Sequence, residues 1–295
     1  MDIILLLLLS ILPVIFFGYL IYERDFDKEP TSILVKLFIC GIGSTFLTLV
    51  ISGVIKWLIP FFENENTTLT VYQLIPYVFL GIAAVEEFSK WIFVYKLEYN
   101  DNEFNHLYDG IVYAAFVALG FACFENILYV INFGNTGLEN GLQVAISRAF
   151  LAIPGHLCDG IMMGYYLSMA KLALKNNNKK ESRKNIILSL LVPVIAHGLY
   201  DYLIMAAEVS NYQTIYLLIF YIFIITFFIY ASKKVKSLST NYYNLNPNYI
   251  GINQRKKMAA LYNKQTVKEN NINKCSNCGH VVKSKYCPEC GKKVE

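Results

Sequence analysis

Seven long apolar segments limit what this chain can fold into. They lie at roughly 2–22, 33–60, 71–95, 108–132, 142–170, 186–206 and 213–232. A helix needs ~20 mostly apolar residues to cross a bilayer, and each segment is about long enough. The segments are continuously apolar rather than alternating, which argues against the strands of a membrane barrel. We therefore expect an all-α polytopic protein of the cell membrane, with about seven transmembrane helices.

The composition supports this class and divides the chain. The 295 residues are 55% hydrophobic and 16% charged, with a mean hydropathy of +0.41. A soluble domain carries ~25% charged residues. The net charge is +4, and 13 of the 26 Lys and Arg residues come after residue 232. We predict a membrane domain over 1–232, a flexible linker over 233–271, and a small separate module over 272–295.

Basic residues alternate between successive loops. The predicted loops at 61–70, 133–141 and 207–212 carry no Lys or Arg, whereas the loops between them and the start of the tail are basic. The richest basic stretch contains Lys171, Lys175, Lys179, Lys180, Arg183 and Lys184. Because cytoplasmic loops carry the excess of Lys and Arg, the pattern predicts an outside N-terminus and a cytosolic C-terminus.

Ionisable side chains lie inside four consecutive apolar segments. In chain order these are Glu86, Glu87, Lys90, Glu125, His156 and His197. A charge at membrane depth costs ~2.5–3.5 kcal/mol on insertion scales, so such residues usually face a polar interior and serve a function there. Counted from the predicted outer ends, the four segments place these groups at a similar depth. We expect one buried polar site between the midplane and the outer leaflet.

The spacing within the third segment suggests acid–base chemistry. Glu86, Glu87 and Lys90 share one face of a helix, because residues three and four positions apart are neighbours. Lys90 can neutralise one carboxylate and leave the other to act as a base. A structural ion pair is the alternative, although two adjacent glutamates exceed what one lysine needs.

Two further polar residues extend this pattern. Tyr129 lies one helical turn after Glu125, and Asp201 lies one turn after His197. Glu125 is either catalytic or orients a histidine, and the sequence leaves both roles open. A carboxylate beside a histidine commonly fixes its tautomer, which is the role we expect for Asp201.

Taken in order, these motifs resemble the PrsW family of intramembrane proteases over roughly residues 1–232. That family is distantly similar to the CAAX prenyl endopeptidases. The resemblance rests on Glu86-Glu87-x-x-Lys90, Phe124-Glu125-x-x-x-Tyr129, His156 and His197-x-x-x-Asp201.

The resemblance implies an endopeptidase that cuts membrane-anchored substrates near the outer face, typically an anti-sigma factor in a site-1-type cleavage. Glu86 or Glu87 would activate water. His156 and His197 would polarise the scissile carbonyl, stabilise the oxyanion or bind a metal, and Asp201 would support His197. The family has been described both as metal-dependent and as glutamate-type. A catalytic zinc and a metal-free mechanism therefore both stay open.

Two other function classes use similar residues. Intramembrane Glu, Lys and His also form the proton relays of ion- or proton-coupled transporters. Such transporters often show paired halves with broken helices, and no such duplication is visible in this sequence. A non-catalytic scaffold that binds membrane proteins is the third reading. Substituting the paired glutamates separates the three, through loss of cleavage, loss of flux or retained binding.

The C-terminal module carries two cysteine knuckles. Cys275-x-x-Cys278-Gly and Cys287-x-x-Cys290-Gly suit a closed tetrahedral zinc site and resemble a short zinc ribbon. A module this small can hardly fold without metal, so we expect a structural zinc here. The ribbon is a candidate for binding a cytosolic protein. We expect no nucleic-acid partner.

Overall fold

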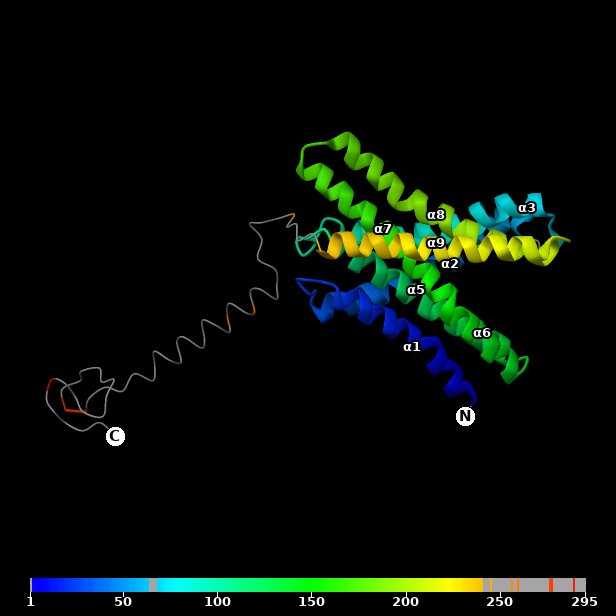
Figure 1. Ribbon diagram of the computed structural model, residues 1–295, viewed down its shortest axis with the longest axis horizontal. Coiled ribbons are helices and arrows are strands. Elements are labelled where there is room, and N and C mark those ends of the chain that lie inside the picture. Colours follow the sequence, from blue (N-terminus) through cyan, green and yellow to red (C-terminus); the bar gives the residue numbers. More distant parts are fainter. Residues whose placement is uncertain are drawn as a thin grey trace. The chain divides into compact units, whose positions relative to one another are not determined.

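The computed structural model describes residues 2–63 and 68–240, with a few isolated residues beyond (Figure 1). Every regular element in this part of the chain is a helix. The elements run in the order α1 (Asp2–Glu23), α2 (Thr31–Leu58), η1 (Pro60–Glu63), α3 (Val71–Pro76), η3 (Tyr77–Ala83), α4 (Ala84–Phe93), η4 (Val94–Glu98), α5 (Asp109–Gly134), α6 (Leu138–Phe150), α7 (Ala152–Lys175), α8 (Lys179–Val209) and α9 (Gln213–Thr240). Seven helical stretches among the described residues are long and apolar enough to cross a membrane, which confirms the predicted fold class.

Two of the seven spans are not simple α-helices. The third runs from Val71 to Glu98 and contains two π-helical stretches, η3 and η4. The fifth breaks at Leu151, where α6 ends and α7 begins. Pro154 follows in the first turn of α7, where a missing N–H costs nothing because no intrahelical partner exists. The chain therefore restarts as a helix just before this proline.

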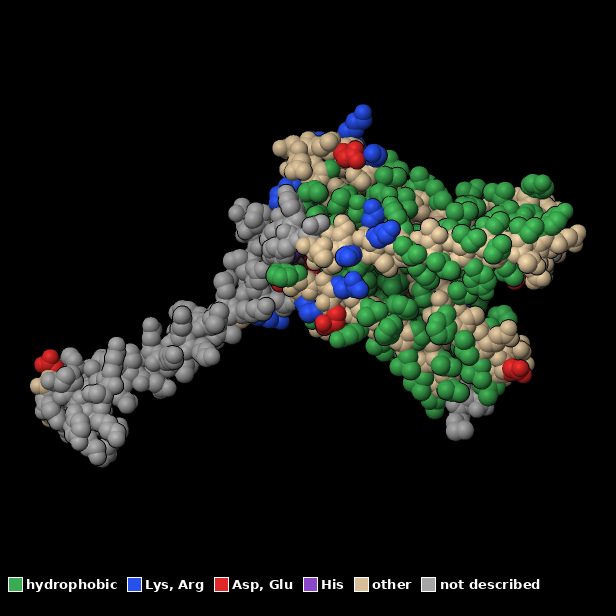
Figure 2. Space-filling model, viewed as in Figure 1, with side chains coloured by type: hydrophobic (Ala, Val, Ile, Leu, Met, Phe, Trp, Pro, Cys, Tyr) green, Lys and Arg blue, Asp and Glu red, His purple; other side chains and the backbone are tan. Residues whose placement is uncertain are grey.

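In this bundle many large hydrophobic side chains are exposed and several charged ones are buried, the reverse of a soluble protein. Trp57 is 82% exposed, whereas Lys90 is fully buried. Hydrophobic side chains cover the flanks of the helices, and Lys and Arg gather near the end where α7 meets α8 and α9 finishes (Figure 2). An apolar exterior around a polar interior is the arrangement expected of a bundle that lies in lipid.

Helix α5 is the centre of the bundle, packed against α1, α2, α6 and α7. Glycines allow the closest of these contacts. A Cβ on Gly120 would collide with the carbonyl oxygen of Phe38, and a Cβ on Gly164 would collide with that of Gly110. Small residues that let backbones approach are typical of membrane helix interfaces. They bring the polar residues of α5 and α7 within reach of each other.

The C-terminal predictions fall mostly outside this description. Helix α9 continues to Thr240, so the segment predicted as a linker from residue 233 begins as a helix. The chain divides into Met1–Tyr249 and Ile250–Glu295. The zinc ligands predicted at Cys275, Cys278, Cys287 and Cys290 lie outside the described residues. The ribbon stays a prediction.

Candidate active site

Four helices bring the predicted polar residues together inside the bundle. Glu86, Glu87 and Lys90 come from α4, Glu125 from α5, His156 from α7 and His197 from α8. Four of them, Glu86, Glu125, His156 and His197, face a cavity of about 100 Å³. The cavity is lined by Ile82, Glu86, Glu125, Tyr129, Arg148, Ala152, Gly155, His156, Asp159, His197, Tyr200, Asp201 and Met205. The structure thus gathers all eight residues singled out in the membrane domain, including Tyr129 and Asp201.

Lys90 lies at the centre of the buried charges. Its Nζ is 2.7 Å from Oε1 of Glu87 and 3.7 Å from Oε2 of Glu86. It also lies 4.0 Å from the ring centre of Phe121, a cation–π distance. Because the lysine is fully buried, removing its partner would leave an uncompensated charge in an apolar interior. Glu87 makes the shorter of the two contacts and is the carboxylate that Lys90 chiefly neutralises.

The neighbours of His156 determine its tautomer. Nζ of Lys90 lies 3.1 Å from Nδ1 of His156, and an ammonium group has only donors, so Nδ1 accepts. The proton of the neutral ring is then on Nε2, which lies 3.0 Å from Oε2 of Glu125. Glu125 therefore accepts from His156 and orients it, the second of the two roles that its position in the sequence left open.

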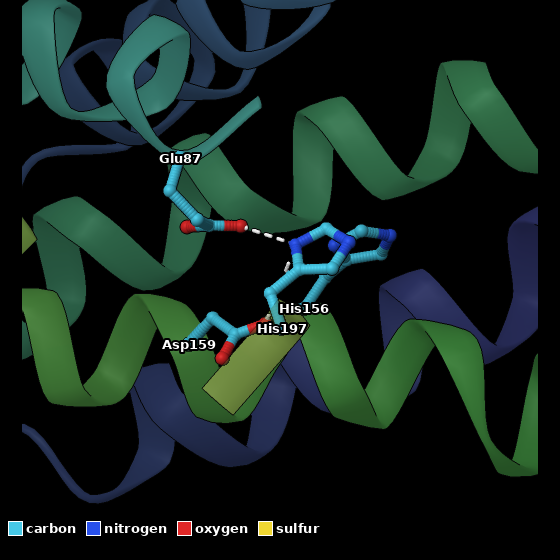
Figure 3. Close-up of side chains that lie close together, drawn as sticks. All are labelled: Glu87, His156, Asp159 and His197. Atoms are coloured by element: carbon cyan, nitrogen blue, oxygen red, sulfur yellow. Dashed lines mark hydrogen bonds and ion pairs between the residues drawn. The ribbon is translucent and has the colours of Figure 1, made fainter. Parts of the chain in front are cut away.

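His197 faces carboxylates on both sides of its ring. Nδ1 lies 2.7 Å from Oε1 of Glu87 and 3.9 Å from Oδ2 of Asp159 (Figure 3). Nε2 lies 3.4 Å from Oδ2 of Asp201 and 3.7 Å from Oε2 of Glu86. Glu87 fixes one nitrogen at hydrogen-bond distance, which leaves Nε2 on the side of the cavity wall formed by Glu86 and Asp201.

The two adjacent glutamates have different surroundings. Glu86 lines the cavity, and 12% of its side chain is exposed, whereas the side chain of Glu87 is completely enclosed. Oε2 of Glu86 makes no hydrogen bond to any described residue. Oε1 of Glu87, by contrast, is bonded to both Lys90 and His197. Oε2 of Glu87 is also unbonded, but Glu87 does not line the cavity, so Glu86 is the carboxylate that a ligand or a water in the cavity could reach.

Two groups of side chains have the donor types and spacing of a metal site. Glu87, His156, Asp159 and His197 form the inner group, and Glu86, Glu125 and His156 form the outer group, with donor atoms within 4.8 Å of one another in each. The ammonium of Lys90 already lies within hydrogen-bond distance of two members of the inner group, Glu87 and His156. The outer group offers three ligands beside a cavity, which is the pattern of a catalytic zinc site with one open position. The outer group has the donor types that a divalent metal needs, and a metal on Nε2 of His156 would replace the hydrogen bond from that nitrogen to Glu125.

Two contributors were absent from the predicted site. Asp159 lies on the first turn beyond His156 and belongs to the inner group. Arg148, in the last turn of α6, donates from Nη2 to Oε2 of Glu125 at 2.6 Å. In the sequence, Arg148 is a single arginine near the start of the fifth apolar segment. Its partner on α5 could be identified only from the folded structure.

Comparison with known proteins shows the family of this chain. The model of the PrsW family of intramembrane metalloproteases matches residues 29–229. Protease PrsW of Geobacillus kaustophilus is 35% identical over 66% of this chain and 77% of its own length. The proteins of the same name from Clostridioides difficile and Bacillus subtilis are each 32% identical over 75% of this chain, covering 86% and 91% of their own lengths. No solved structure matches the chain. The chain belongs to the PrsW family of intramembrane proteases.

Proposed function

We propose that Glu86 is the general base of this protease, and that Glu87 holds the site together. The observation that supports the proposal is the contrast between the two carboxylates. Glu86 lines the cavity with an unbonded buried oxygen, whereas Glu87 is enclosed by its bonds to Lys90 and His197. A general base must lie within hydrogen-bond reach of the water that it activates.

The reaction then follows from the residues around the cavity. The Glu86 carboxylate takes a proton from water while the water oxygen attacks the scissile carbonyl carbon. His197, with both ring nitrogens protonated, donates from Nδ1 to Glu87 and from Nε2 to the carbonyl oxygen as negative charge develops there. Glu86 returns the proton to the amide nitrogen as the C–N bond breaks. Water and one peptide bond are consumed, and a carboxylic acid and an amine are formed.

The family is described as metalloproteases, and the outer group of Glu86, Glu125 and His156 would hold the metal. A bound divalent ion supplies Lewis-acid polarisation and lowers the pKa of its water. Each carboxylate has two oxygens, so the proton-accepting role of Glu86 is compatible with a ligand role. Glu125 has a different part in the two cases: without a metal it accepts from Nε2 of His156, and with a metal it would be a ligand beside that nitrogen.

The substrate class follows from the depth of the site. The charged residues lie inside helices that cross the membrane, so the scissile bond must enter the bundle within the bilayer or at its edge. A single-pass membrane-anchored protein fits this requirement. We propose an anti-sigma factor, cut on the outer side under the predicted orientation with the N-terminus outside.

The test is cleavage of defined single-pass substrates. Full-length protein in detergent would be mixed with each tagged membrane-anchored anti-sigma factor of its own genome, and the fragments sequenced. We expect one cut near the outer membrane boundary in the wild type and none with Glu86→Gln. Absence of cleavage of every such factor, together with proton flux in vesicles that Glu86→Gln abolishes, would instead identify a transporter.

A further inference from the structure

Arg148 is the second buried cation of the site, and no step of the proposed reaction uses it. It lies in the last turn of α6, one turn before the break at Leu151. The end of a helix carries partial negative charge, which favours a cation at this position. Its side chain is 15% exposed and reaches the cavity, so the guanidinium is largely removed from lipid and water.

The guanidinium is oriented by three contacts, all to α5. Nη2 donates to Oε2 of Glu125 at 2.6 Å, and Nε donates to Oδ1 of Asn126 at 2.9 Å. The central carbon lies 4.1 Å from the ring centre of Tyr129. One donor of the rigid guanidinium plane binds the Glu125 carboxylate and the other binds the Asn126 amide, so the direction of the bond to Glu125 is fixed. A lysine could supply the charge but not this geometry.

The oxygen that Arg148 binds is the oxygen that orients His156. Oε2 of Glu125 accepts from Nη2 of Arg148 at 2.6 Å and lies 3.0 Å from Nε2 of His156. On the other side of the ring, Nδ1 of His156 lies 3.1 Å from Nζ of Lys90. Arg148 and Lys90 are therefore the two ends of one hydrogen-bonded chain through the histidine. Moving either cation would release the ring.

We propose that Arg148 is a positioning residue, which holds Glu125 so that its Oε2 accepts from Nε2 of His156, and which affects cleavage through that carboxylate alone. For the cleavage part, this inference rests on the proposed function. It also assigns a role to the break at Leu151: the helix that carries Arg148 is separate from the helix that carries His156. The site is therefore complete only when α6 is packed against α5.

The test follows the histidine ring directly, without reference to activity. The chain has four histidines, so ¹⁵N-histidine labelling of the full protein in micelles gives few signals, and His156→Asn assigns one set. We expect Arg148→Gln to shift the His156 signals, Glu125→Gln to shift them as well, and the double variant to show no larger change than Glu125→Gln. Arg148→Lys should leave the signals between those of the wild type and Arg148→Gln. The exposed Arg183→Gln is the matched control and should leave them unchanged.

Kinetics on an anti-sigma factor substrate give the second measurement. Outer partners of catalytic residues typically contribute ~10–100-fold to activity. We expect Arg148→Gln to lower kcat by about this factor with KM unchanged, and to add nothing in a Glu125→Gln background. Unchanged His156 signals in Arg148→Gln would overturn the proposal, as would a further loss in the double variant or a raised KM, which indicate direct contact with substrate. If no substrate is cut, the proposed function fails, and the ring signals still decide the role of Arg148.

Discussion

Oε1 of Glu87 lies 2.7 Å from Nδ1 of His197, a residue 110 positions later in the chain. The same oxygen lies 2.7 Å from Nζ of Lys90. One enclosed carboxylate thereby joins α4 to α8 and neutralises the buried lysine. Its neighbour Glu86 has no such bond and faces the cavity. The two glutamates should therefore respond differently to the same substitution.

Glu86→Gln should abolish cleavage while leaving the bundle intact. Loss of a general base costs ~10²–10⁴-fold in rate. Glu87→Gln should reduce the stability as well, because breaking a buried ion pair by removing one partner costs about 3–5 kcal/mol. Thermal unfolding in detergent, run beside the cleavage assay, measures both effects. A Glu87→Gln protein of wild-type stability, together with an active Glu86→Gln protein, would reverse the two assignments.

The glycine contact between α2 and α5 predicts a second difference. A Cβ on Gly120 would meet the backbone carbonyl of Phe38, which no rotamer change can move away. Gly120→Ala should therefore destabilise the protein by about 1–3 kcal/mol through overpacking. A Cβ on Gly53 would have no neighbouring atom within 4 Å, so Gly53→Ala should be neutral or stabilise by up to about 1 kcal/mol. Equal unfolding temperatures for the two variants would contradict the packing argument.

Much of this fold could be predicted from the lengths of the apolar segments alone. A span needs about twenty apolar residues, and the seven segments that meet this requirement all became membrane-length helices. Hydropathy does not reveal where a helix breaks or becomes π-helical within an apolar segment. The break at Leu151 and the two π-helical stretches of the third span lie inside segments that read as continuous.

The site was predictable as a set of residues but not as a set of roles. The free-energy cost of placing a charge at membrane depth singled out each ionisable residue as a candidate. Helical spacing places Glu86 and Glu87 equally well beside Lys90, so spacing cannot decide between them. The proposed assignment rests on the bond from Glu87 to His197, which forms only when α4 packs against α8. The pairing of Arg148 with Glu125 was hidden for the same reason.

A buried acidic cluster outside the membrane spans predicts how stability depends on pH. Asp25 is 4% exposed, and burial raises its pKa from 3.8 to about 7. Burial, with Asp109 and Asp25 nearby, raises the pKa of Glu29 to about 10. The folded chain therefore keeps protons that the unfolded chain releases. The stability contributed by Asp25 is fully present below a pH of about 4 and is lost as the pH rises through about 7.

Asp25→Asn removes this titration and should make the fall in unfolding temperature between a pH of about 4 and about 7 smaller, with the remaining fall due to Glu29. The exposed Glu208→Gln is the control and should keep the wild-type slope. The measurement is thermal unfolding in one detergent across a pH series at constant ionic strength. An Asp25→Asn protein with the wild-type slope would show that Asp25 titrates normally in the folded state.

Metal content should separate the two sites in one chain. The predicted ribbon holds one zinc on four cysteines, and the outer group of the membrane site fits a second ion. We expect two ions per wild-type chain, one in Cys275→Ser/Cys278→Ser and one in His156→Asn. Cleavage should survive the cysteine substitutions and fail with His156→Asn, because the ribbon zinc is structural. The alternative result is a single ion in the wild-type chain that is lost with the cysteines while cleavage continues. It would mean that Glu86 and His197 hydrolyse the peptide bond without a metal. Element analysis of the purified full chain and its variants distinguishes these outcomes.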